Sequence, residues 1–151
     1  MTLAEVYDLT PAASYTPASP RLTNISARVQ VGTGGNILIA GFAVGGSTSK
    51  TVLIRASGPA IAAAPFNVPG TLPDPELQLY QGNTLLETNT AWGGSAPIAN
   101  AAASVGAFTW ANATSKDSAI LVTLPPGAYT AQVSGASGDT GVALVEVYEI
   151  P

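Results

Sequence analysis

The chain has 151 residues, a length typical of one domain, and only 9% of its residues are charged, against about 25% in ordinary soluble domains. It has no Cys and no His, which excludes disulfides, thiol nucleophiles, the usual zinc sites and histidine general bases. Five cations against nine anions give a net charge of −4 and exclude a basic nucleic-acid surface or a polybasic membrane contact.

The first feature along the chain is a duplicated heptapeptide. Residues 3–9 read LAEVYDL and residues 144–150 read LVEVYEI, with four identical positions and three close substitutions. From residue 3 to residue 144 the offset is 141. The match predicts that residues 1–10 are an orphan strand, equivalent to the last strand of a preceding module in a tandem array. A chance match between two strands is the alternative.

Residues 11–20, PAASYTPASP, form a segment rich in proline (Pro11, Pro17 and Pro20). Such a composition predicts a semi-rigid, extended linker, with an ordinary surface loop as the alternative. The β-sandwich module is therefore expected to span residues 21–151. Residues 1–11 lack the basic and apolar regions of a signal peptide, so a signal, if the protein is secreted, lies outside this sequence.

The module alternates short apolar segments with Gly- and Pro-rich turns, which predicts about eight strands. They are expected at residues 24–31, 36–44, 50–57, 76–80, 84–88, 118–124, 128–134 and 142–149. One helical turn is expected within 58–69, and a short helix within 96–108 that ends near Gly106. No run of 18 apolar residues exists, so no membrane insertion is expected. The predicted fold is all-β: an antiparallel β-sandwich of the jelly-roll or Ig-like kind, with one or two short helices in loops.

Two stretches of the second half, LQLYQGNTLLETNTAW (77–92) and LPPGAYTAQVSGASGDTGVALVEVY (124–148), together resemble the bacterial pre-peptidase C-terminal domain. That family has a G-x-x-L hairpin, an Asn/Asp-rich loop and an L-P-x-G-x-Y strand. Residues 22–46 and 50–61 are similar to tandem β-sandwich repeat modules of large secreted bacterial surface proteins. The resemblance implies a calcium-tolerant jelly-roll accessory domain outside the cell, without a catalytic role.

The loop after the hairpin departs from that pattern. Relatives often carry aspartates there, whereas residues 88–91 read TNTA. Calcium requires six or more oxygen ligands, usually including several carboxylates. Asp74 and Asp117 therefore stay only weak metal candidates, with a turn or capping role as the favoured alternative, and no cofactor is expected.

Few residues of the chain can carry catalysis. Without His or Cys, a nucleophile would need a Ser–Lys pair, and both candidates, Ser49-Lys50 and Ser115-Lys116, are adjacent residues in polar turns. Adjacent residues of a strand point to opposite faces, so we expect no enzyme. Trp92 and Trp110 are expected in loops, where exposed rings would stack on sugars. The favoured alternative is that both plug the ends of the sandwich over the Ala-rich segment.

The duplicated strand is the most informative functional signal. Its alternation places Leu3, Glu5 and Tyr7 on one face and Ala4, Val6 and Asp8 on the other, and such a strand needs a partner. We therefore expect an extracellular or cell-surface structural module that assembles end to end, in a tandem array or by strand addition. The residues expected to mediate assembly are Leu3, Glu5, Val6, Tyr7 and Leu9, and the expected partners are copies of the chain, head to tail. The alternative is a carbohydrate- or surface-binding accessory module of a secreted protein.

Overall fold

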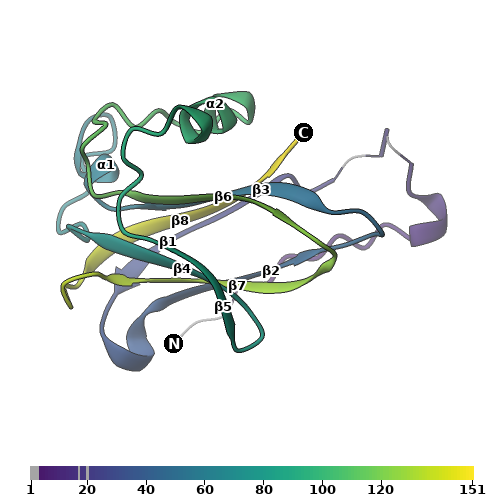
Figure 1. Cartoon of the computed structure of the whole chain (residues 1–151), viewed down its shortest axis with the longest axis horizontal. Coiled ribbons are helices and arrows are strands. Elements are labelled where there is room, and N and C mark those ends of the chain that lie inside the picture. The colour runs from purple at the N-terminus through teal and green to yellow at the C-terminus, as the bar shows by residue number, and fades with distance from the viewer. Residues whose placement is uncertain (1–3, 17, 20) are drawn as a thin grey trace.

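The computed structural model describes residues 4–16, 18–19 and 21–151, and shows two β-sheets packed face to face (Figure 1). Its strands are β1 (Asn24–Val31), β2 (Leu38–Val44), β3 (Lys50–Ser57), β4 (Pro75–Gln81), β5 (Thr84–Asn89), β6 (Ser118–Leu124), β7 (Gly127–Gly135) and β8 (Gly141–Ile150). Every strand overlaps one expected from the sequence. The antiparallel β-sandwich is therefore confirmed.

The strand order places the end of the module in the middle of one sheet. Sheet A has the order β1-β8-β3-β6 and sheet B the order β2-β7-β4-β5, and neighbouring strands are antiparallel in both. Within β8, Val145 lies opposite Ala27 of β1 on one side and Ala56 of β3 on the other. Strands β1 and β6 are the edges of sheet A, while β2 and β5 are the edges of sheet B.

The core lies between the sheets because apolar residues alternate along their inner faces. Leu77 and Leu79 of β4 are fully buried, and so are Ala131 and Val133 of β7. From sheet A, the same core receives Val52, Ile54, Ile120, Ala143, Val145 and Val147. Each fully buried Val, Leu or Ile side chain contributes about 1.5–3 kcal/mol, so this alternation is the main determinant of the fold.

Two short helices lie over the outer face of sheet A, beside β3 and β6 (Figure 1). They are α1 (Pro59–Ala62) and α2 (Ala96–Ser104). The predicted end of α2 is confirmed, because Gly106 has a φ of 70° and the Ala107 N–H donates to the Ala102 carbonyl at 3.0 Å. Below the helices, a second apolar cluster includes Leu53, Trp92 and Trp110.

The linker is more compact than its composition predicts. Residues Ala12–Ser14 form a 3-10 turn, in which the Ser14 N–H donates to the Pro11 carbonyl at 2.9 Å. A second turn follows, closed by a 2.9 Å bond from the Ser19 N–H to the Thr16 carbonyl. The expected extended conformation is thus interrupted twice. Pro17 and Pro20 lie outside the described residues. A further 3-10 turn, Gly34–Asn36, joins β1 and β2.

Candidate functional site

The N-terminal segment, defined here as residues 4–10, lies outside both sheets. Its apolar side chains are exposed: Val6 at 60%, Tyr7 at 70% and Leu9 at 87%. Residues 4–10 make no backbone hydrogen bond to either sheet within the described structure. Of the expected assembly residues, only Leu3 lies outside the described part of the chain. The other four sit on this accessible segment, which leaves apolar surface and backbone groups in water.

A side-chain hydrogen bond of the N-terminal segment is repeated in its duplicate. The Tyr7 hydroxyl donates to Glu5 at 2.7 Å, and the Tyr148 hydroxyl donates to Glu146 at 2.6 Å. Both bonds span two residues, the spacing that places side chains on one face of a strand. The hydrogen bond to Glu5 raises the pKa of Tyr7, and burial followed by the bond to Glu146 raises the pKa of Tyr148. The two segments therefore share a local contact as well as a sequence.

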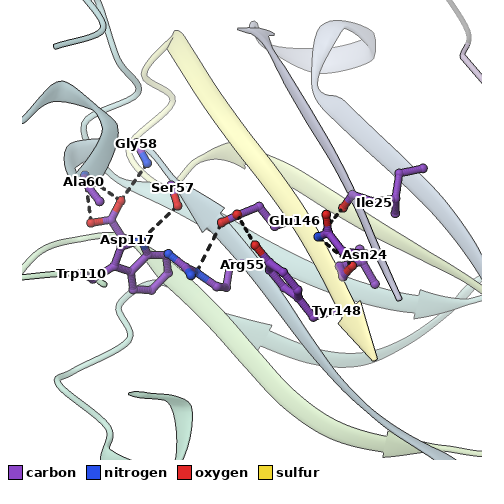
Figure 2. A network of polar contacts seen from close by, with 11 residues as sticks. Asn24, Ile25, Arg55, Ser57, Gly58, Ala60, Trp110, Asp117, Glu146 and Tyr148 are labelled. Atoms are coloured by element: carbon purple, nitrogen blue, oxygen red, sulfur yellow. Dashed lines mark hydrogen bonds and ion pairs between the residues drawn. The ribbon is translucent and has the colours of Figure 1, made fainter. Parts of the chain in front are cut away.

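In β8 this pair is completed by a buried arginine of β3 (Figure 2). The Arg55 Nε lies 3.4 Å from the second Glu146 carboxylate oxygen, an ion-pair distance without hydrogen-bond geometry, and both side chains are almost fully buried. The guanidinium carbon lies over the rings of Phe108 and Trp110, 4.4 and 4.3 Å from their centroids. Burial lowers the pKa of Arg55, while the negative charge of Glu146 raises it.

Sequence reasoning missed this charge pair. Its signal was a single Arg within the apolar segment KTVLIRAS and a single Glu within VALVEVYE, since isolated charges in buried strands are usually paired. Glu5, the duplicate of Glu146, has no cation within ion-pair distance among the described residues. The N-terminal segment thus carries the Glu–Tyr half of a motif and lacks its arginine.

Asp117 has the capping role that was the favoured alternative to metal binding. Its carboxylate is fully buried and accepts from the backbone N–H groups of Gly58 (2.8 Å) and Ala60 (3.1 Å), and from the Ser115 hydroxyl (2.7 Å). It therefore holds the start of α1. Asp74 accepts from the Ser137 hydroxyl at 2.7 Å. Within the described ranges, no group of three or more Asp or Glu side chains is placed to hold a metal ion.

Trp92 and Trp110 are buried, as in the favoured alternative to sugar stacking, although they pack beneath the helices on sheet A rather than at the end of the sandwich. Their exposed fractions are 8% and 7%, and the rings meet edge to face with centroids 5.5 Å apart. The Trp110 indole N–H donates to Ser57, and that of Trp92 to the Asn112 carbonyl. The adjacent cavity, between Arg55 and α2, has a volume of only about 50 Å³. No ring face is free to stack on a sugar, because both rings anchor the loops to sheet A.

The free edge of β1, meaning the side facing away from β8, is the complementary feature of sheet A. The Glu149 N–H donates to the Thr23 carbonyl at 2.9 Å, which makes odd-numbered residues the hydrogen-bonded partners of β8. Backbone groups of the even-numbered residues therefore point to the free edge. Ile25 and Val29 face the core side, opposite Val147 and Ala143, yet remain 42% and 39% exposed. Among the described residues, this edge thus offers backbone groups without a partner strand, together with apolar surface.

No protein-family model matches the chain, and no curated protein matches it. Among solved structures, the chain is similar to the pre-peptidase C-terminal domain of collagenase from Bacillus anthracis, whose crystal structure was determined at 1.0 Å. The sequences are 11% identical, the match covers 83% of this chain and 89% of that one, and the TM-score is 0.49. The expected tandem repeats stay a prediction. Among the described residues, no helix has both the length and the apolar character needed to span a bilayer.

Proposed function

We propose that this chain is a non-catalytic, extracellular structural module that assembles end to end through residues 3–9. Assembly occurs by strand addition between chains or by covalent succession of modules in an array. One observation carries the proposal: residues 4–10 are exposed and make no backbone hydrogen bond to either sheet among the described residues, yet residues 3–9 are identical to residues 144–150 of β8 at four of seven positions, and both segments form a Tyr–Glu hydrogen bond. Because the segment resembles a central strand but belongs to neither sheet, we expect it to pair with a sheet of another module.

Strand addition would satisfy what the N-terminal segment lacks. Pairing with a sheet edge satisfies backbone donors and acceptors and removes alternate side chains from water. With only 9% charged residues, the chain has few of the charges that usually prevent edge-to-edge association. Because donor segment and acceptor edge are different surfaces, repeated association is head to tail and gives an open filament unless the rotation closes a ring.

The test is the oligomeric state of the full chain at several concentrations. We would use size exclusion with light scattering and negative-stain imaging to compare the wild type with Val6→Pro/Tyr7→Pro and Val6→Thr/Tyr7→Thr. Successive residues of a strand direct their N–H groups to opposite sides, so one of the two prolines removes a donor to the acceptor strand in any register, whereas threonine keeps both N–H groups and is β-branched. We expect ordered polymers for the wild type and the double threonine variant, and monomers for the double proline variant.

Folding controls accompany these variants. Because Val6 and Tyr7 are exposed and lie outside both sheets, circular dichroism spectra and melting temperatures should be the same for all three chains. A wild type that stays monomeric at its highest soluble concentration would refute assembly by strand addition between separate chains. Polymers that persist unchanged in Val6→Pro/Tyr7→Pro would refute the role of residues 3–9.

A further inference from the structure

We propose that the acceptor of the N-terminal segment is the free edge of β1 in a second copy, paired antiparallel with Glu5 opposite Arg28. This inference rests on the proposed function and adds the partner surface and its register. In this register Tyr7 lies opposite Ser26, and Val6 lies opposite Ala27. The added strand becomes a fifth strand of sheet A.

The backbone of β1 has donors and acceptors on its free edge that can form this pairing. Ser26, Arg28 and Gln30 direct their N–H and C=O groups away from β8, as the pairing of Thr23 with Glu149 requires. An antiparallel partner then exchanges two hydrogen bonds with each of these residues. In the proposed register, Glu5 and Tyr7 are the residues that exchange bonds with Arg28 and Ser26. Val6 and Ala27 form the closer, non-hydrogen-bonded pair between them.

Most of the facing side chains then match. On the core side, Ala4 lies opposite Val29 and Val6 lies opposite Ala27, where they would cover apolar surface of Ile25 and Val29, which are 42% and 39% exposed. Asp8 is the one charged residue on this face and lies opposite Ile25, near the end of the added strand. On the outer face, the carboxylate of Glu5 meets the guanidinium of Arg28. Arg28 is exposed and has no ion pair within the part of the chain that the structure describes.

Charge separates this edge from the other three. The edge strands are β1, β2, β5 and β6, all fully described, and Arg28 is the only Lys or Arg in any of them. Strand β5 instead carries Glu87, which would repel Glu5 and Asp8. Strands β2 and β6 carry no charged residue. An acidic donor strand is therefore best matched by β1.

Cysteine cross-linking tests the register, because the natural chain has no Cys and every disulfide would come from the introduced pair. Directly opposite, non-hydrogen-bonded residues have Cα atoms about 4.5 Å apart, within the range of a disulfide. We would oxidise full-length Val6→Cys/Ala27→Cys and, as a control, Val6→Cys/Leu86→Cys, which probes the β5 edge. We expect a ladder of disulfide-linked oligomers on denaturing gels for the first variant and not for the second.

Charge exchange provides an independent readout by light scattering. Arg28→Glu should lower the association constant by about two- to fivefold, because an exposed ion pair contributes only about 0.2–1 kcal/mol. Lys116→Glu changes the net charge equally at a residue outside the edge strands and should leave association unchanged. The double variant Glu5→Arg/Arg28→Glu has the charge of the wild type and should restore its association.

The outcomes separate this inference from the proposed function. Cross-linking in Val6→Cys/Leu86→Cys rather than in Val6→Cys/Ala27→Cys would overturn the β1 edge as the acceptor. Oligomers whose association is the same in the wild type and in the charge variants would overturn it as well. Neither result would contradict end-to-end assembly. In Val6→Cys/Ala27→Cys, a disulfide within single chains, with no gain in mass, overturns the second copy as partner. Monomers in every variant overturn strand addition itself, and the acceptor with it.

Discussion

The buried pair of Arg55 and Glu146 offers the sharpest test of what holds sheet A together. Glu146→Gln keeps the size of the side chain and an acceptor for the Tyr148 hydroxyl, but removes the charge 3.4 Å from the Arg55 Nε. Arg55 is 1% exposed, and its guanidinium has no hydrogen-bond partner among the described residues, so Glu146 compensates its charge by the ion pair alone. Breaking a buried ion pair by removing one partner costs about 3–5 kcal/mol.

This loss is large against the total stability of a domain, which is about 5–15 kcal/mol. At about 2–4 °C per kcal/mol for a chain of this size, the melting temperature should fall by about 6–20 °C. Urea unfolding followed by circular dichroism would measure the free energy of unfolding. Glu87→Gln, at an exposed position of β5, is the matched control and should change it by less than about 0.5 kcal/mol.

A second variant separates the charge pair from simple packing. Replacing both partners with apolar residues, as in Arg55→Met/Glu146→Leu, leaves no uncompensated buried charge and should cost less than Glu146→Gln alone. Stability of Glu146→Gln within about 1 kcal/mol of the wild type would refute the reasoning. It would mean that the cation is stabilised mainly by the rings of Phe108 and Trp110.

Two further predictions concern buried polar groups. Tyr148→Phe should lower stability at pH 7 by about 1.5–3 kcal/mol. The pKa of Tyr148 is raised in the folded state, so above about pH 10 the tyrosine of the unfolded chain ionises first and the wild type loses this extra stability. The difference between the urea midpoints of the wild type and Tyr148→Phe should therefore narrow above about pH 10, and a constant difference would contradict this. Asp117→Ala leaves three donors unpaired and should lower the free energy of unfolding by at least about 3 kcal/mol. The melting temperature should fall equally in buffer with calcium and in buffer with a chelator. A fall seen only with calcium would indicate that Asp117 is a metal ligand.

The strands could be predicted because their signals are local. Alternation in residues 24–31 depends only on neighbours in sequence, and so does the short turn between the strands expected at 76–80 and 84–88, where Gly82 has a φ of 57°. The strand order could not be predicted, because it depends on pairing between distant segments. For the same reason, the adjacency of Arg55 and Glu146 became visible only when β3 and β8 were placed side by side.

The candidate site divides in the same way. Duplication of LAEVYDL in LVEVYEI is a pattern within the sequence, so the N-terminal segment could be singled out without a structure. The proposed acceptor edge could not, because it depends on β1 lying at the edge of sheet A and on the exposure of Ile25 and Val29 in the folded chain. Trp92 and Trp110 were ambiguous for a related reason: a loop position does not say whether an indole ring points outward or back onto the sheet.

The position of β8 has a consequence for how the chain folds. Strands β1 and β3 are neighbours only through β8, and β8 follows every other strand in the sequence. During synthesis, sheet A therefore stays in two unconnected parts until the last strand of the sandwich has been made, whereas sheet B is complete once β7 exists. Late closure of a non-local sheet slows folding and leaves strand edges exposed meanwhile. Folding intermediates of this protein should therefore contain a formed sheet B and a sheet A in which β8 has not yet joined β1 to β3.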